Sequence, residues 1–467
     1  IACGNSASRI KVVNTNTVLT SIAFSQTIDW NIKQFFNSTS IKSPFELKRI
    51  GKAITRRKDQ MAVEDDKQYK RITIKTNCGG VFVRDEVLGK DIKTKNQYYV
   101  KAGQLAVSKI DARNGAFGIV PPEADGAIIT GNFWVYDVDP EIANIDYLIL
   151  LLSSNVFVQA WQDCSNGSGN RLYLQEDKFL NYKIPLPSIS KQNQIIMAYN
   201  HLLNKATNLE CEAINIEKDL RKSVFDSLGI KMKKKSVSAS MLNIVRFQNI
   251  RQWGYDKIAI DFPYSFEKYK CHSLSSNPSW LKEIYRGKSP KYQQHGKRII
   301  LNQKCNRTNK IDLKYAKTVN ELWFSKIPCD QLTQINDIVI NSTGEGTLGR
   351  ASLIVSDEHV GLAYDSHMLL LRVNLKEIDP LLFVYLFNSP LGQRQVDLYK
   401  SAQATKQTEL GIENTKRIRF PLPPLAIQKS ISNFIEKETL QIGKLHEKAT
   451  EFYQKAKKEF EEAIFGE

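Results

Sequence analysis

Cysteine is scarce in this sequence, and the patterns that would give it a structural role are missing. The seven cysteines among 467 residues are widely separated, and no two of them form a Cys-x-x-Cys pair. A disulfide framework and a structural zinc site therefore lack support, which favours a reducing, cytoplasmic setting. Apolar runs of about eighteen residues are also missing, as is the basic-then-apolar pattern of a signal peptide. We therefore expect neither membrane insertion nor export.

The motifs of common catalytic sites are absent as well. The six histidines show no metal-ligand spacing; His367 is the most suggestive of them and is interpreted as a buried structural residue. The glycine-rich segment 344–349 matches the dinucleotide-binding fingerprint and follows a predicted strand over 337–340. Residues 350–355 indicate another strand instead of the helix that such a site needs, so we predict a wide β-hairpin loop. No Asn/Asp-Pro-Pro-Tyr/Phe tetrapeptide for methyl transfer to a base is present, and the chain is predicted to be non-catalytic.

The sequence does contain enough apolar residues for folded cores, together with an excess of positive charge. Apolar residues make up 42% and charged residues 25%, and the length fits two domains of about 150–200 residues each. The net charge is +17, and the excess lies in residues 1–187, with 24 Lys and Arg against 19 Asp and Glu, and in residues 241–423, with 26 against 17. Such an excess predicts binding to a phosphate backbone or another anionic partner.

Two nearly neutral segments have the pattern of long helices. Apolar residues recur every three, four or seven positions from Ile196 to Val224, and again from Ile431 to Ala463. Each helix is predicted to span about forty residues, or about 60 Å. Packing of each helix against its own domain is one possibility, but two apolar stripes of equal length favour an antiparallel coiled coil.

The two halves of the chain repeat each other. Ile-Pro-Leu-Pro at 184–187 and Phe-Pro-Leu-Pro-Pro at 420–424 each precede a glutamine, Gln192 or Gln428, and then a predicted helix. Upstream, a phenylalanine and a tryptophan six residues apart recur in segments 24–30 and 247–253. These repeats predict a tandem duplication. The predicted domains are a first globular domain over 1–187, of which 1–20 are not assigned, a helix over 188–229, a basic linker over 230–240, a second globular domain over 241–423 and a C-terminal helix over 424–467.

With these motifs the chain resembles the DNA specificity (S) subunits of type I restriction-modification systems. The proline-leucine-proline segments, their glutamines and the helices look like the conserved regions of that family, and the globular halves look like its target-recognition domains. Further similar segments are 70–75 and 109–120 in the first half, and 287–290, 302–305, 341–350 and 407–410 in the second.

The resemblance implies an α+β fold with two tandem α/β target-recognition domains, separated by two long helices that form an antiparallel coiled coil. It also implies a non-catalytic subunit that binds double-stranded DNA and serves defence against foreign DNA. Each domain would recognise one half of a split, asymmetric target, and the helices would set the gap. The implied partners are two methyltransferase (M) subunits, which use S-adenosylmethionine to methylate adenine, and possibly two restriction (R) subunits, which use ATP and Mg²⁺. No cofactor is expected on this chain.

Candidate DNA contacts follow from the side chains that recognise bases, namely Arg or Lys for guanine, Asn or Gln for adenine, and small hydroxyls. In the first half they are Lys109, Arg113, Asn114, Asn170 and Arg171. In the second half they are Lys288, Gln303, Lys304, Asn306, Arg307, Ser342, Thr343, Gln403, Lys406 and Gln407. Two alternatives remain open: a non-catalytic scaffold that recruits partners through its helices, and a stand-alone DNA-modifying enzyme.

Overall fold

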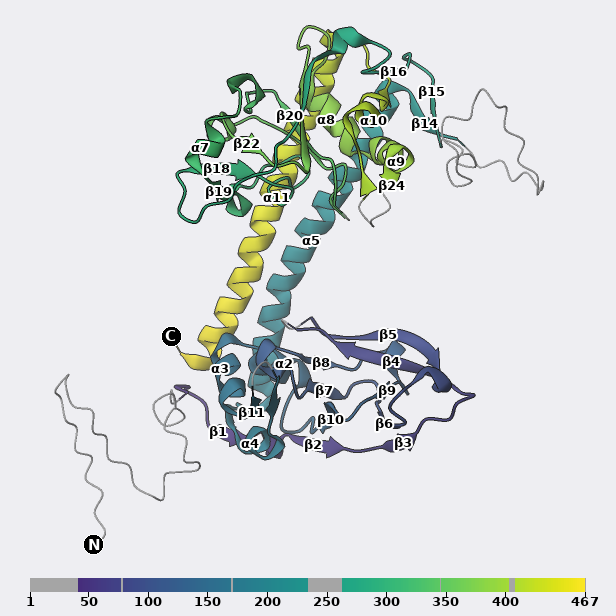
Figure 1. Ribbon diagram of the computed structural model, residues 1–467. Coiled ribbons are helices and arrows are strands. Elements are labelled where there is room, and N and C mark those ends of the chain that lie inside the picture. The colour runs from purple at the N-terminus through teal and green to yellow at the C-terminus, as the bar shows by residue number, and fades with distance from the viewer. Residues whose placement is uncertain are drawn as a thin grey trace, which may run out of the picture. The chain divides into compact units, whose positions relative to one another are not determined.

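The computed structural model describes residues 41–76, 79–168, 171–233, 263–344, 346–402 and 408–466 (Figure 1). It divides into two compact units, and the two long helices, α5 (Ile189–Leu228) and α11 (Leu425–Phe465), contribute to both. The first unit contains the described residues up to 206 and those from 451 onward, and the second contains those from 207 to 450. The repeated segments 24–30 and 247–253 lie outside the described residues. Among the described helices, none combines the length and the apolar character that crossing a bilayer requires.

The first unit contains two larger sheets, of four and five strands, and two two-stranded sheets, with short helices beside them. Its strands are β1 (Leu47–Arg49), β2 (Ile54–Arg57), β3 (Gln60–Ala62), β4 (Gln68–Ile74), β5 (Val81–Leu88), β6 (Asn96–Tyr99), β7 (Leu105–Ser108), β8 (Phe117–Ile119), β9 (Ile128–Ile129), β10 (Phe133–Val138), β11 (Ser165–Ser168), β12 (Arg171–Leu174) and β13 (Lys183–Pro185). Its helices before α5 are α2 (Ile145–Leu152), α3 (Asn155–Asp163) and α4 (Glu176–Asn181).

The second unit has the same kinds of element in a similar order. Its strands are β14 (Ile230–Met232), β15 (Tyr264–Phe266), β16 (His272–Ser273), β17 (Leu281–Arg286), β18 (Arg298–Leu301), β19 (Lys317–Val319), β20 (Ile338–Asn341), β21 (Ala351–Leu353), β22 (Ala363–Tyr364), β23 (Met368–Val373), β24 (Ser401–Ala402), β25 (Thr408–Glu409) and β26 (Arg419–Phe420). The helices before α11 are α7 (Glu321–Phe324), α8 (Pro380–Asn388), α9 (Pro390–Tyr399) and α10 (Ile412–Lys416).

Strand order reveals the predicted duplication. The central sheet runs β2-β10-β7-β8 in the first unit and β17-β23-β20-β21 in the second, and the small sheets β1-β13 and β11-β12 are matched by β16-β26 and β24-β25. In each unit two consecutive helices follow the strand that is second in the order of the central sheet. In the first unit α2 and α3 follow β10, and in the second α8 and α9 follow β23. The tandem repeat and the α+β class predicted from the sequence are therefore confirmed.

The repeated framework carries a different insertion in each unit. The first unit adds a five-stranded sheet of order β3-β6-β9-β4-β5, whereas the second adds a three-stranded sheet of order β19-β18-β22. Segment 344–349 connects β20 to the antiparallel strand β21, with Ile338 opposite Leu353, which confirms the predicted hairpin loop. The predicted basic linker is not wholly irregular, because its first residues form β14 and pair with β15.

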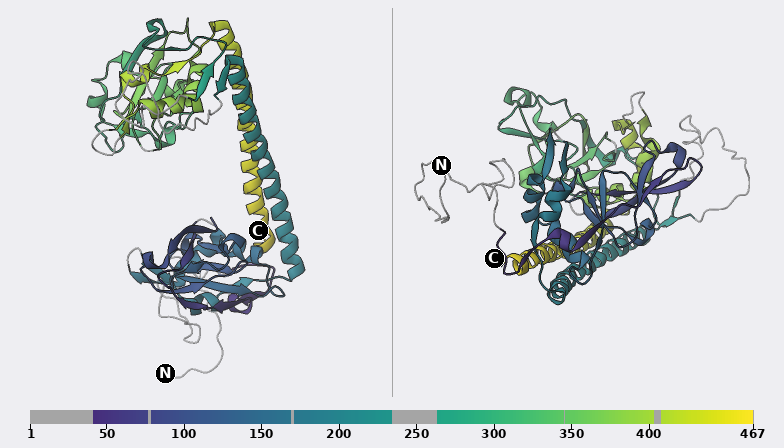
Figure 2. Two further views of the ribbon diagram at one scale, coloured as in Figure 1. Left: turned by 90° about the vertical axis from the view of Figure 1, so that its right-hand side faces the viewer. Right: turned by 90° about the horizontal axis from the view of Figure 1, so that it is seen from below.

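The long helices pack side by side in antiparallel fashion within each unit (Figure 2). In the first unit Tyr199 of α5 contacts Phe460 of α11, with ring centroids 5.8 Å apart. In the second unit Val224 of α5 and Ile435 of α11 belong to one buried core. Phe434 shares the apolar stripe in the sequence but is 40% exposed, because adjacent helical positions point about 100° apart and only Ile435 enters the core.

Gln192 explains why a glutamine follows the first proline-leucine-proline segment. Its side chain is fully buried, and its Oε1 accepts a hydrogen bond from the Asn144 N–H at 2.8 Å. Its Nε2 donates to the carbonyls of Ile142 and Pro187, both at 2.9 Å. One amide thereby joins the first turn of α5 to the segment that begins α2.

Gln428 makes the same three bonds in the second unit. Its Oε1 accepts from the Asp379 N–H at 2.9 Å, and its Nε2 donates to the carbonyls of Glu377 at 2.9 Å and Pro423 at 2.8 Å. A shorter or charged side chain could not satisfy one donor and two acceptors at once. The repeated glutamine therefore joins each long helix to its own domain through three hydrogen bonds, an arrangement that we call the glutamine clasp.

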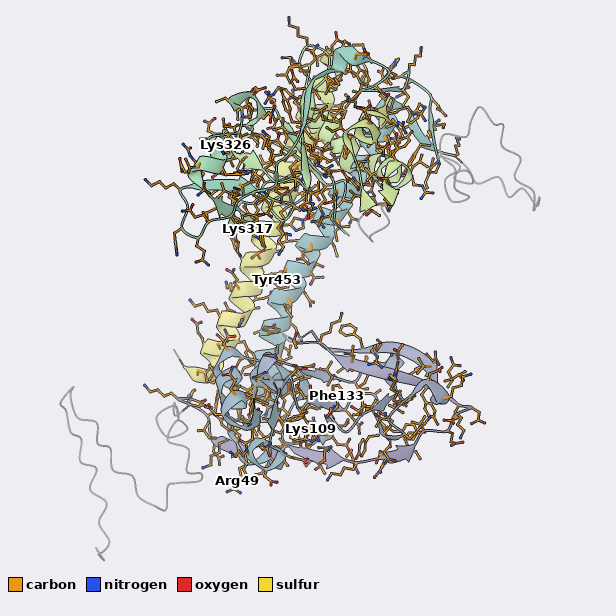
Figure 3. The ribbon with its side chains drawn as sticks, viewed as in Figure 1. Arg49, Lys109, Phe133, Lys317, Lys326 and Tyr453 are labelled. Atoms are coloured by element: carbon orange, nitrogen blue, oxygen red, sulfur yellow. The ribbon has the colours of Figure 1, made fainter. Side chains whose placement is uncertain are left out.

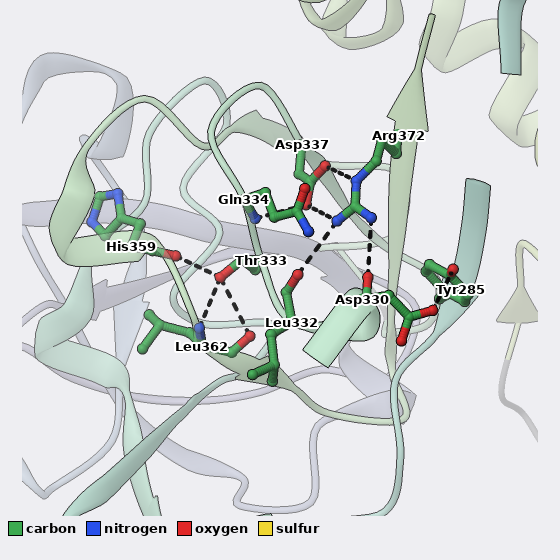
Figure 4. Close-up of polar contacts among 9 residues, drawn as sticks. All are labelled: Tyr285, Asp330, Leu332, Thr333, Gln334, Asp337, His359, Leu362 and Arg372. Atoms are coloured by element: carbon green, nitrogen blue, oxygen red, sulfur yellow. Dashed lines mark hydrogen bonds and ion pairs between the residues drawn. The ribbon is translucent and has the colours of Figure 1, made fainter. Parts of the chain in front are cut away.

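A buried ion pair fixes the start of β20 in the second unit (Figure 4). The Arg372 guanidinium donates two hydrogen bonds of 2.7 Å to the carboxylate of Asp337, whose side chain is 1% exposed. The same guanidinium donates to the carbonyls of Asp330 and Leu332, and Asp337 also accepts from the Gln334 N–H at 2.7 Å. This network joins β23 to the irregular segment before β20.

Candidate nucleic-acid interface

One predicted DNA contact of the first unit, Lys109, lies at a corner where β7 ends beside the start of β10. The Lys109 N–H donates to the Asn132 carbonyl at 2.9 Å, and the Leu174 N–H of β12 donates to the Lys109 carbonyl at 2.8 Å. We call Lys109, Asn132 and Leu174 the first corner. Asn132 is exposed, and Lys109, which is labelled in Figure 3, is half-buried.

The second unit has a corner with the same backbone connections. The Ser342 N–H donates to the His367 carbonyl at 2.8 Å, and the Leu410 N–H donates to the Ser342 carbonyl at 2.8 Å. Ser342, His367 and Leu410 form the second corner. Lys109 therefore corresponds to Ser342, and Asn132 corresponds to His367. One framework presents different side chains at equivalent places in the two units.

The first corner lies against an aromatic and charged cluster. The Lys109 ammonium lies 5.3 Å from the centroid of the Trp134 ring, and the Arg56 guanidinium lies 5.4 Å from the same centroid. Arg56 is also paired with Glu176, with Nη1 and Oε1 2.9 Å apart. Burial, followed by the nearby charge of Arg56, lowers the pKa of Lys109 from its usual value. These contacts hold the lysine against the sheet.

The other candidates of the first unit have mixed surroundings. Arg113 is half-buried, whereas Asn114 is exposed and donates to the Asp111 carboxylate at 3.3 Å. The backbone of Arg171 begins β12, at the opposite end of that strand from Leu174, which contacts Lys109. Asn170 lies outside the described residues. As base contacts, all four stay predictions.

The second corner contains a chain of polar side chains. Gln303 Nε2 donates to the Thr343 carbonyl at 2.6 Å and lies 2.8 Å from Thr343 Oγ1. Thr343 Oγ1 lies 2.8 Å from His367 Nδ1. Gln303 and His367, from separate segments of the chain, are thus joined through one nearly buried hydroxyl.

Neighbouring groups hold these three hydrogen-bonded residues in position. The Gln303 carbonyl accepts from Asn341 Nδ2 at 3.1 Å, and the His367 N–H donates to the Asp365 carboxylate at 3.0 Å. Gly344 has a φ of 102°, and a Cβ there would lie 2.5 Å from Thr347 Oγ1 and 3.0 Å from Gln303 Nε2. Glycine is needed at 344 both for its backbone conformation and for the close approach of the loop.

Two predicted contacts of the second unit do not fit the structure. Asn306 is fully buried; its Nδ2 donates to the Arg350 carbonyl, and its Oδ1 accepts from Ser352 Oγ, both at 2.8 Å. The Ser342 side chain is also fully buried, although its backbone forms the corner. Neither side chain can reach a base in this conformation, because Asn306 is enclosed and hydrogen-bonded internally and Ser342 is enclosed by packing.

The remaining candidates of the second unit are mostly accessible. Lys288 and Lys304 are exposed, and the exposed Arg307 lies with its guanidinium 4.3 Å from the centroid of the Tyr315 ring. Gln403, Lys406 and Gln407 lie outside the described residues. As DNA contacts, all of these positions stay predictions.

Asn132 is not among the contacts predicted from the sequence, and the sequence predicts His367 only as a buried structural residue. Both residues immediately precede a central strand, β10 or β23, and His367 is half-buried instead of enclosed. The available signal was the polar residue just before each apolar strand, but only the strand register shows that the two positions correspond. In the described ranges no cluster of three or more His, Cys, Asp or Glu side chains is arranged to hold a metal ion.

We expect Asp365→Asn to raise the Tm of the second unit at pH 7. Burial raises the pKa of the Asp365 carboxyl above its usual value. A raised folded-state pKa means that the carboxylate costs stability above that pKa, and that the cost disappears as the pH falls toward the unfolded-state value. Thermal unfolding should therefore show a gain at pH 7 that shrinks near pH 4, about the pKa of an unfolded aspartate. The exposed Asp357→Asn is the control, and an equal effect of Asp365→Asn at both pH values would contradict the expectation.

Comparison with known proteins shows which family this sequence matches. The sequence matches the type I restriction modification DNA specificity domain over residues 40–218 and 288–451. The putative type I restriction enzyme MjaX specificity subunit of Methanocaldococcus jannaschii is 27% identical over 183 residues. That match covers 36% of this chain and 43% of that protein, so it spans less than half of the relative's length.

Comparison with solved structures gives two further matches. A chain from a structure on complex assembly and conformational transition of the type I R-M system has a TM-score of 0.52 and 13% identity, covering 90% of this chain and 98% of that one. The type I restriction-modification S subunit from M. genitalium has a TM-score of 0.42 and 12% identity, covering 92% and 97%. The first of these likenesses supports the fold alone. Because the family match extends over more than half of the sequence, the chain belongs to the type I restriction-modification DNA specificity family.

Proposed function

We propose that this chain is the specificity subunit of a type I restriction-modification complex and recognises a split, asymmetric DNA target. One observation carries the proposal: the two corners have the same backbone hydrogen bonds but different accessible side chains, Lys109 and Asn132 in the first and His367 in the second. A duplicated framework suits two half-targets, and unequal side chains suit two different base sequences.

The distribution of charge supports DNA as the ligand. The positive excess lies in residues 1–187 and 241–423, the globular parts that contain the corners, whereas the segments with the long helices are nearly neutral. Phosphate contacts by exposed side chains such as Lys288 and Lys304 would supply affinity without sequence preference. Base contacts at the corners would add the specificity.

The chemistry belongs to partner subunits in this proposal. The chain itself is non-catalytic and binds no cofactor; two methyltransferase (M) subunits use S-adenosylmethionine to methylate adenine in the cytoplasm. The complex can also recruit restriction (R) subunits, up to two, which use ATP and Mg²⁺. The paired helices, with a fixed rise of about 1.5 Å per residue, set the gap between the half-targets.

Mapping of methylated adenines tests the proposal. Cells that express this chain with the methyltransferase of its own system should methylate one bipartite motif genome-wide, and the motif should vanish when this chain is deleted. Replacing residues 241–423 with the matching domain of a related subunit should change one half of the motif and leave the other half and the spacing intact.

Three results would contradict the proposal in different ways. Unchanged methylation without this chain would favour a scaffold that has no role in DNA recognition. Methyl transfer by the purified chain alone would favour a stand-alone enzyme. A domain exchange that altered both half-targets would show that the two units do not recognise DNA separately.

A further inference from the structure

We propose that the second corner recognises one adenine of its half-target through a composite pair of groups, the acceptor Gln303 Oε1 and the donor His367 Nε2–H. The inference rests on the proposed function and adds to it a base and two residues. Three residues carry it: Gln303, Thr343 and His367, joined through the Thr343 hydroxyl.

The orientation of the Gln303 amide follows from chemistry. A backbone carbonyl can only accept hydrogen bonds, so the amide atom 2.6 Å from the Thr343 oxygen must be the nitrogen. The same nitrogen lies 2.8 Å from Thr343 Oγ1, so both of its hydrogens have internal acceptors. Gln303 can therefore offer only Oε1 to a ligand.

The tautomer of His367 follows from the next bond. Thr343 Oγ1 accepts from Gln303, and its own hydrogen needs an acceptor because the side chain is only 6% exposed. Within the described part of the chain, His367 Nδ1 at 2.8 Å supplies that acceptor. With Nδ1 accepting, neutral His367 carries its proton on Nε2, and Nε2–H becomes a donor.

Both outward groups are available to a ligand. Gln303 and His367 are half-buried, and neither Gln303 Oε1 nor His367 Nε2 has a hydrogen-bond partner or complete burial among the described residues. The glycine at 344 holds the loop against the Gln303 amide, and Asp365 holds the His367 backbone. Binding would therefore require little rearrangement of these two side chains, which favours specificity.

The donor and acceptor pattern selects among bases. Adenine presents the N6 amino donor and the N7 acceptor in the major groove, which matches an acceptor beside a donor. A free glutamine meets this pattern with its own amide, but the Gln303 nitrogen is occupied, so His367 supplies the missing donor. Guanine presents two acceptors, N7 and O6, and O6 would face the Gln303 oxygen unfavourably.

The proposed contact to adenine N7 can be tested by removing that single atom from the DNA. The methylated motif and the domain exchange define the second half-target; each of its adenines, on either strand, is then replaced in turn by 7-deazaadenine, which lacks only the N7 acceptor. The full chain, assembled with its methyltransferase, is titrated with each duplex. We expect one position at which wild-type affinity falls about tenfold, the size of a specific base contact.

His367→Phe should remove the sensitivity to that one atom. The variant should bind the natural target about tenfold more weakly, and 7-deazaadenine at the same position should cause no further loss. Thr343→Val, which removes the shared hydroxyl, should reduce the same sensitivity. The control is His272→Phe, at a half-buried histidine beside Trp280 in the same unit, and it should keep the wild-type response.

Several outcomes would overturn the inference while leaving the proposed function intact. They are a second half-target without an A·T pair, a wild-type protein insensitive to N7 at every adenine, or an equal 7-deaza effect in wild type and His367→Phe. The wild-type titration decides the matter even if a variant fails to fold. Failure of the proposed function would appear earlier and separately, as a methylation pattern independent of this chain.

Discussion

Arg372→Ala is expected to lower the free energy of unfolding of the second unit by about 3–5 kcal/mol, because it strands a buried carboxylate. Asp337 is 1% exposed at its side chain and receives two hydrogen bonds of 2.7 Å from Arg372. The substitution also removes the donors to the carbonyls of Asp330 and Leu332. Urea unfolding monitored by tryptophan fluorescence would measure the loss.

Arg298→Ala is the matched control for this experiment. Arg298 pairs with Glu321 in the same unit, but the two side chains are 53% and 60% exposed. Because solvent screens the attraction between two exposed charges, this ion pair contributes little to stability. The control should therefore change the free energy of unfolding by less than about 1 kcal/mol. Equal, small effects of Arg372→Ala and Arg298→Ala would show that the Asp337 ion pair does not stabilise the domain.

Gln192→Ala and Gln428→Ala are expected to destabilise the first and second units by about 3 kcal/mol each, or more. Each substitution leaves one backbone N–H and two carbonyls without their buried partner, at a cost of about 1–3 kcal/mol per group. The backbone N–H of Asn144 donates a hydrogen bond to Gln192, and that of Asp379 donates one to Gln428. Each of these amide protons should exchange with solvent faster when its glutamine is replaced. Hydrogen exchange therefore locates the effect at the start of α2 or α8.

Exposed glutamines of the same chain supply the controls. Gln162 of α3 and Gln441 of α11 are exposed, and their replacement by Ala should leave stability within about 0.5 kcal/mol of wild type. Each clasp variant should also leave the other unit's exchange pattern unchanged. A loss no larger than that of the controls would show that Gln192 and Gln428 do not fasten the helices to their domains.

Local patterns in the sequence predicted the helices and the duplication well. The spacing of apolar residues follows directly from the 3.6-residue period of the helix, so α5 and α11 could be inferred without knowing what they contact. The hairpin around residues 344–349 was predicted for a similar reason, since two short apolar strands flank a glycine-rich loop. The repeated glutamines were recognised as a pattern, but their bonds to segments about fifty residues away were not.

Candidate site residues were harder to predict because side-chain type does not determine burial. Asn306 has the amide that suits adenine recognition, yet packing beneath the β20–β21 hairpin encloses it, with bonds to Arg350 and Ser352. His367 lacked a metal-binding pattern and was assigned a structural role, although it ends a chain of hydrogen bonds near the surface.

By itself, the sequence determined the class of fold, the two helices, the repeat and the separation of charge, because each depends on composition or on short periodic spacing. Only the tertiary structure decided that Lys109 corresponds to Ser342 and Asn132 to His367. That correspondence depends on the register of β7 with β10 and of β20 with β23, which joins residues far apart in the chain. Alternating buried and exposed side chains help to set such a register, but the strands that pair are separated in the sequence, so no local pattern shows which residues become neighbours.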